Sequence, residues 1–158
     1  MFQTIERIFL RLLLGWALLS MTLGGIGLVG SSVSSTPRAG HAFLGALSLQ
    51  FLIWGAINAA LSGVALRGVA RREAHPLPTD QELAQRERTI RILSLNIKLD
   101  LLWITIGVAL LLLALVFPES MASLLGHGLG VVLQGGFLLL FDRLFARRLR
   151  GVLHVEDR

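Results

Sequence analysis

The side chains in this sequence that are most able to do chemistry are polar residues set inside long apolar stretches. One group combines carboxylates, amides and a single guanidinium, and it consists of Asn58, Asn96, Asp100, Gln134, Asp142 and Arg11. A polar group in hydrocarbon is costly unless it is paired, so each of these residues marks a candidate site with a partner to be identified. Arg11 lies at a depth compatible with both carboxylates, and we expect it to pair with Asp100 or Asp142.

Asp100 stands out within this polar intramembrane cluster. Steps of four, three and four residues place a set of side chains on one narrow stripe of a helix: Asn96, Asp100, Trp103 and Gly107. Two interpretations are open. Polar residues between membrane helices often act as hydrogen-bonding glue, at about 0.6 kcal/mol on average. Alternatively, the carboxyl group of Asp100 serves a proton-coupled or small-solute carrier.

His41 and His127 form a second candidate site. Each lies toward the outer end of an apolar stretch, the two stretches are predicted to run in the same direction, and small residues flank the imidazoles. Paired histidines between the helices of a bundle are suitable ligands for b-type haem. The alternative is that both are surface or hydrogen-bonded histidines. Haem is the one cofactor that the sequence suggests.

Four long apolar stretches carry these residues. Hydrophobic residues make up 54% of the 158 residues and charged residues only 16%, against roughly 45–50% and 25% in a soluble domain. A membrane-spanning helix needs about 20 mostly apolar residues. We therefore predict an all-α bundle of four transmembrane helices, forming a single membrane domain over residues 1–158, with spans at residues 12–30, 42–66, 97–117 and 121–141.

The segments between these stretches define the connections. Residues 67–90 are predicted to form a cytoplasmic loop, from which the third helix extends into the bilayer, because no Pro or Gly occurs between residue 79 and Gly107. Pro118 predicts a tight turn that makes the third and fourth spans antiparallel neighbours. The first span has the basic start of a secretory signal, but its apolar run is longer than a usual signal core. We expect this span to be retained.

Basic residues are distributed unevenly along the chain. If both termini are cytoplasmic, all of the fifteen Lys and Arg residues except Arg38 lie on the cytoplasmic side. Cytoplasmic segments of membrane proteins carry such an excess, so we predict cytoplasmic N and C termini and attraction to anionic lipid headgroups. The net charge of +5 could also serve nucleic-acid binding, but no RNA-binding motif accompanies it. We expect no nucleic-acid partner.

Small residues at four-residue steps predict faces where helices pack closely. They are Gly55, Ala59 and Gly63 in the second stretch, and Gly126 and Gly130 in the fourth. Small side chains allow membrane helices to approach each other. Whether these faces meet each other or a second copy of the chain is open at this point. We expect a homo-oligomer or a place in a larger membrane complex.

The sequence offers little for enzyme chemistry. It contains no Cys, which excludes thiolate metal sites and a cysteine nucleophile, and it has no phosphate-binding loop, zinc-protease motif or serine-triad order. We predict no catalytic residue and no metal site. The predicted function is a non-enzymatic interaction or accessory module with a buried polar cluster. The alternatives are the carrier that uses Asp100 and haem binding by His41 and His127.

Three short motifs carry a resemblance to a known family. They are Trp54-Gly55-Ala56-Ile57-Asn58, Asn96-Ile97-Lys98-Leu99-Asp100, and Gln134-Gly135-Gly136-Phe137 with Phe141-Asp142. Over about residues 41–146 the chain resembles an uncharacterised bacterial family of small four-helix integral membrane proteins. The resemblance implies a four-helix fold in the bacterial inner (plasma) membrane. It implies no particular activity.

Overall fold

The computed structural model consists of four long helices joined by short connections. It describes residues 2–33, 37–75 and 78–156. The elements are α1 (Phe2–Val33), α2 (Arg38–Ala74), α3 (Thr79–Val116), the short 3₁₀ helix η1 (Pro118–Ser120) and α4 (Met121–Glu156). No strand occurs within those residues. The predicted all-α fold with four helices is confirmed.

Prolines mark the starts of three elements. Pro37 and Pro78 are the N-caps of α2 and α3, and Pro118 begins η1. Proline has no amide hydrogen and a fixed φ, which suits the start of a helix and disrupts its interior. Each helix therefore runs unbroken to its next connection. Residues 67–90, expected as a loop, belong to α2 and α3 apart from the short connection between Ala74 and Thr79.

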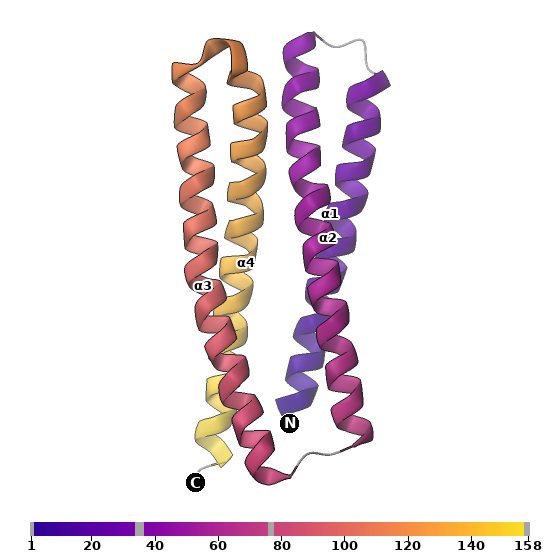
Figure 1. The fold of residues 1–158 in the computed structure, drawn as a ribbon, viewed down its shortest axis with the longest axis vertical. Helices are drawn as coiled ribbons and strands as arrows, with labels where there is room; N and C mark the ends of the chain where they lie inside the picture. Colours follow the sequence, from indigo (N-terminus) through magenta and orange to yellow (C-terminus); the bar gives the residue numbers. More distant parts are fainter. Residues whose placement is uncertain (1, 34–36, 76–77, 157–158) are drawn as a thin grey trace.

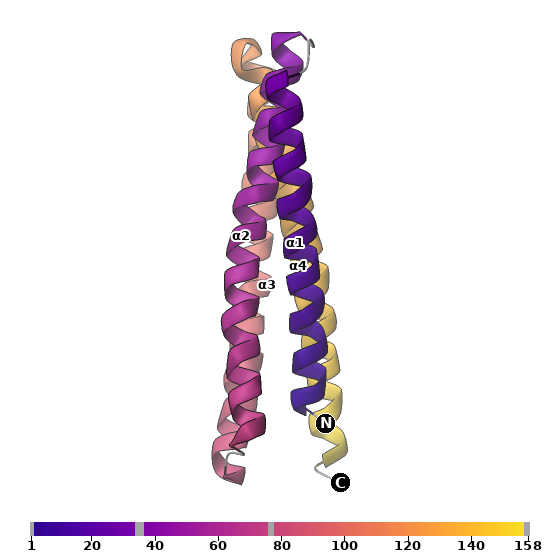
Figure 2. The same cartoon turned by 90° about the vertical axis from the view of Figure 1, so that its right-hand side faces the viewer.

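The four helices form two antiparallel hairpins, α1–α2 and α3–α4, which are joined mainly by packing of α2 on α4 (Figure 1). The beginning of α1, the end of α4 and the α2–α3 connection lie at one end of the bundle, which we call the termini end. The α1–α2 connection and η1 lie at the other, the turn end. Figure 2 shows α2 and α3 along one edge, α1 and α4 along the other, and the two pairs diverging toward the termini end.

Large apolar side chains cover the outside of the bundle. Ile26, Val64 and Leu115, for example, are 66%, 69% and 75% exposed. So much exposed apolar surface would make a protein aggregate in water, whereas the hydrocarbon of a membrane solvates it. All four helices are long and apolar enough to cross a membrane. This indicates a multi-pass membrane protein.

Candidate functional site

A cavity of about 480 Å³ lies between the helices in the half of the bundle nearer the termini end. It is found where the backbones of α2 and α3 stay apart. All four helices contribute to its wall, from Trp54 and Trp103 at one end to Arg72 and Gln85 at the other. Most of the wall between these ends is apolar. The volume falls within the range of about 300–1,000 Å³ that is usual for small-molecule sites.

Four residues of the predicted polar cluster line this cavity. Asn58 comes from α2, Asn96 and Asp100 from α3, and Asp142 from α4. The side chains of Asn58, Asp100 and Asp142 are almost fully buried. Trp103 also lines the cavity, so three residues of the stripe predicted on α3 share one wall. The periodicity of the sequence therefore indicated the right face of this helix.

The two carboxylates of the cavity differ in their partners. The side chain of Asn96 lies close enough to the carboxylate of Asp142 for a favourable polar interaction. In contrast, Oδ2 of Asp100 and Nδ2 of Asn58 are buried without a hydrogen-bond partner. Asp100 also lies close enough to Asp142 for their negative charges to repel. A buried polar atom without a partner costs about 1–3 kcal/mol, so these two atoms mark the place where a bound molecule would stabilise the protein most.

Arg11 is not part of this site. Its side chain is exposed, and none of the ion pairs within the described residues includes it. On α1, Leu10 and Leu13 line the cavity, and Arg11 is turned about 100° away from Leu10. The prediction that Arg11 pairs with Asp100 or Asp142 is wrong, because depth along the bundle does not determine the direction in which a side chain points.

Gln134 is buried outside the cavity and bonds within the bundle. Its Oε1 accepts a hydrogen bond from Nε1 of Trp16 at 3.0 Å, and its Nε2 donates one to Oγ of Ser20 at 3.2 Å. Gln134 and Ser20 are both completely buried. These bonds connect α4 to α1. Gln134 therefore shows what a purely structural polar residue looks like in this protein.

Pairs of side chains lie at both ends of the cavity. Toward the turn end, the rings of Trp54 and Trp103 meet edge to face, with centroids 5.2 Å apart. At the termini end, Nη2 of Arg72 lies 2.7 Å from Oε2 of Glu6. Neither Glu6 nor Arg72 was predicted as a site residue from the sequence. The sequence does carry a signal for their ion pair: adjacent charges occur in opposite order on the two helices, as Glu6-Arg7 on α1 and Arg72-Glu73 on α2. Two ion pairs can therefore form side by side, and Arg7 does pair with Glu73.

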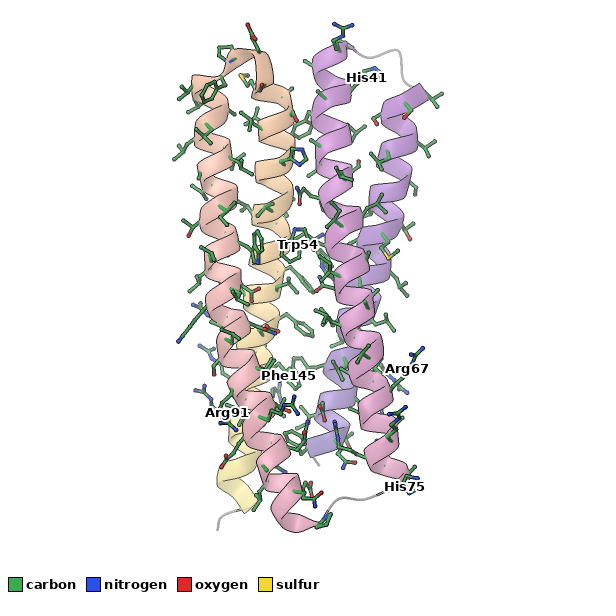
Figure 3. All side chains as sticks on the ribbon, viewed as in Figure 1. His41, Trp54, Arg67, His75, Arg91 and Phe145 are labelled. Atoms are coloured by element: carbon green, nitrogen blue, oxygen red, sulfur yellow. The ribbon has the colours of Figure 1, made fainter. Side chains whose placement is uncertain are left out.

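The two histidines of the proposed haem site do not face each other across an open space. Nδ1 of His127 is hydrogen-bonded to Nε2 of Gln50 at 2.9 Å. Here α4 touches α2 so closely that a Cβ atom on Gly126 would collide with backbone atoms of α2. His41 lies near the start of α2 at the turn end (Figure 3). Haem ligation by the pair stays a prediction.

The predicted packing residues contact helices of the same chain. A Cβ atom on Gly55 would lie 2.8 Å from a backbone carbonyl oxygen of α1, and one on Gly130 would lie 2.6 Å from a side-chain carbon of α2. Gly126 likewise faces α2. Gly63 has open space around it, and Ala59 is half-buried. The small-residue faces of α2 and α4 thus do not meet each other: Gly55 faces α1, whereas the α4 glycines face a different part of α2.

The fold and the cavity together define a class: a bundle of four helices, each able to cross a membrane, around a partly polar cavity. Residues 12–143 match the model of the family of unknown function DUF6992, and the chain belongs to this family. No curated protein and no solved structure matches it. Membership of an uncharacterised family is thus confirmed, and the four polar residues of the cavity lie within the matched range.

Proposed function

We propose that this protein is a non-enzymatic membrane protein that binds a small solute in the cavity between its helices, as a carrier does. One observation supports this most strongly: Nδ2 of Asn58 and Oδ2 of Asp100 are buried without hydrogen-bond partners, and both residues line a cavity of about 480 Å³. Buried polar groups are nearly always paired, as those of Gln134 are here. A bound solute would supply the missing partners.

The same observation favours solute binding over the simpler interaction module. A module that only docks onto other membrane proteins needs its specific groups on the outside, where this bundle carries apolar side chains. The polar groups of Asn58 and Asp100 instead face inward. Gly55, Gly126 and Gly130 pack within the chain, so they do not supply a face for a second copy. Association into a homo-oligomer or a larger complex stays a prediction.

Access to the cavity can be tested with a matched pair of cysteine variants. The chain has no Cys of its own, so an introduced thiol is the only one. Ser62 and Ser20 are both fully buried, but only Ser62 lines the cavity. In lipid discs, the neutral reagent methyl methanethiosulfonate should modify the Ser62→Cys variant much faster than the Ser20→Cys variant. Equal rates, or no reaction at either position, would show that the cavity admits no solute and would refute the proposal.

We further propose a bacterial inner-membrane location with both termini in the cytoplasm. Both ends of the chain lie at one end of the bundle (Figure 1), and exposed arginines such as Arg67, Arg71 and Arg147 occur near that end, where they suit anionic headgroups. In intact cells, a membrane-impermeant thiol reagent should label a Ser32→Cys variant and leave an Arg67→Cys variant unlabelled. The reverse pattern would invert the topology.

A further inference from the structure

We propose that the solute is an organic cation, namely a primary or secondary ammonium group attached to an apolar body. The inference rests on the proposed function and assigns the chemical class of its solute. It starts from the charges on the cavity wall. Asp100 and Asp142 are acidic, and Arg72 is the one basic residue among the described residues that line the cavity. Arg72 is already paired with Glu6 at 2.7 Å, so nothing on the wall balances the two carboxylates.

The position of Asp100 along its helix makes this imbalance important. Asp100 lies 21 residues after the start of α3 at Thr79 and 16 residues before its end at Val116. At 1.5 Å per residue these separations are about 31 Å and 24 Å. The distance to Val116 is only slightly less than the roughly 30 Å of a hydrocarbon core, so Asp100 lies just inside the termini-end edge of the span predicted at residues 97–117. An isolated charge in hydrocarbon is costly and pairs with an opposite charge. The cavity is the space in which such a charge can be received.

Hydrogen bonding narrows the chemical class to an ammonium group that carries N–H donors. Oδ2 of Asp100 is an acceptor without a partner, and Asp100 is only 5% exposed. A primary or secondary ammonium donates to such an oxygen and brings the missing charge at the same time. A quaternary ammonium brings the charge without a donor. Nδ2 of Asn58 and Nε of Arg72 are further buried atoms of lining residues without a partner, and each can donate to an acceptor elsewhere on the solute.

The remaining wall suits an apolar body. Trp103 follows Asp100 by three residues and shares its face of α3, and its ring meets that of Trp54. Indole faces attract cations and pack well against other rings. Leu61, Ala65 and Ile92 line the wall on the side of the termini end. A space of about 480 Å³ is far larger than a single metal ion requires, and the largely apolar wall would leave most of an ion's coordination shell unfilled.

Three probes of nearly the same shape test the inference: 2-phenylethylammonium, neutral 2-phenylethanol and anionic 3-phenylpropionate. Their binding to the protein in phosphatidylglycerol discs can be followed by the fluorescence of Trp54 and Trp103, with calorimetry as a second readout. We expect the ammonium probe to bind most tightly and the carboxylate least. Asp100→Asn should weaken ammonium binding by about 10- to 100-fold, as expected for loss of a hydrogen bond to a charged group. It should leave binding of the alcohol nearly unchanged.

Two controls separate this effect from a general change of charge or fold. Glu119→Gln removes a carboxylate from the exposed η1 at the turn end and should leave all three affinities unchanged. If the Asp100→Asn variant does not fold, a second measurement replaces the binding comparison with that variant. It is the rate at which methyl methanethiosulfonate modifies the Ser62→Cys variant in the presence of each probe. The ammonium probe should slow that reaction and 3-phenylpropionate should not.

The outcomes distinguish this inference from the proposed function. If Ser62→Cys reacts but the three probes bind alike, or Na⁺ or Mg²⁺ alone protects the thiol, the organic-cation inference is overturned and the solute site stands. If the Ser62→Cys variant does not react, both the inference and the proposed function are refuted.

Discs that contain phosphatidylethanolamine identify the source of the ammonium group. Weaker probe binding at rising phosphatidylethanolamine content indicates a lipid headgroup, and unchanged binding indicates a soluble amine; both results support an ammonium site.

Discussion

The two halves of the bundle are held together by different side chains. Toward the turn end, glycines bring backbones into contact. Gly24 of α1 and Gly126 of α4 each press against α2, and Gly107 of α3 meets Gly128 of α4. Toward the termini end, phenylalanines fill the interfaces instead. Aromatic pairs there follow one another with ring centroids 3.8–5.8 Å apart, in the order Trp16–Phe137, Phe137–Phe141, Phe141–Phe9 and Phe9–Phe145.

This difference explains where the cavity lies. Helices that meet through glycines lie so close that no space is left between them. Large aromatic side chains hold α1 and α4 together through their rings, while α2 and α3 meet through the rings of Trp54 and Trp103. The half of the bundle nearer the turn end (the turn half) is therefore tightly packed. The half nearer the termini end (the termini half) contains the cavity and its polar groups. Any opening that admits a solute is expected in the termini half.

The largest effect is expected from a change in the turn half. A Cβ atom on Gly24 would lie 2.7 Å from the carbonyl oxygen of Ser48 and 2.8 Å from the amide nitrogen of Leu52. Because both are backbone atoms, the helices must separate to accommodate Gly24→Ala. We expect a loss of about 2–3 kcal/mol in the free energy of unfolding, near the upper part of the usual range for overpacking. Denaturant titration in mixed micelles measures it.

Its matched control is the adjacent glycine. A Cβ atom on Gly25 meets nothing within 4 Å. Gly25→Ala should therefore leave stability unchanged or raise it by up to about 1 kcal/mol, because alanine has the better helix propensity. Equal losses for both variants would mean that close contact with α2 does not hold the turn half together.

The comparison also shows which features were readable from the sequence. The four helices and the inward stripe of Asp100 follow from local properties, namely the length of apolar runs and the 100° step of a helix. The positions of Arg11 and Gln134 were misjudged because they depend on how one helix is rotated against another. Both residues lie at a plausible depth, but Arg11 points outward and Gln134 bonds to α1. Relative rotation is set by long-range contacts that a single sequence does not display.

The ion pair at the termini end should contribute an intermediate amount. Glu6 is 7% exposed and accepts a hydrogen bond from Arg72 at 2.7 Å. Glu6→Gln removes the charge that Arg72 faces, and we expect a loss of about 1.5–2 kcal/mol, at the lower end of the range for hydrogen bonds to charged groups. Thr4→Ala, an exposed change on the same helix, serves as the control. A loss no greater than that of the control would show that the pair does not stabilise the end of the cavity.

The hydrogen bonds of Gln134, near the border between the halves, should contribute slightly less. Gln134→Leu keeps the approximate volume and removes the partners of Trp16 and Ser20. Hydrogen bonds between membrane helices average about 0.6 kcal/mol, so a loss of about 1 kcal/mol is expected. A double-mutant cycle with Trp16→Phe isolates the bond at 3.0 Å. A coupling energy near zero would contradict its role as an α1–α4 connection.

The smallest effect on stability is expected at Asp100, the residue on which the proposed function depends most. Its Oδ2 has no partner to lose, and Asp142 repels its charge. Asp100→Asn should therefore change the free energy of unfolding by less than about 0.5 kcal/mol, or raise it, since the variant relieves the repulsion. Asp142→Leu is the contrasting variant, because it removes the carboxylate with which the side chain of Asn96 interacts and should cost about 1 kcal/mol. If Asp100→Asn destabilised the empty protein as strongly as Asp142→Leu, the carboxylate of Asp100 would serve to stabilise the fold. The proposal of a solute bound at that position would then be refuted.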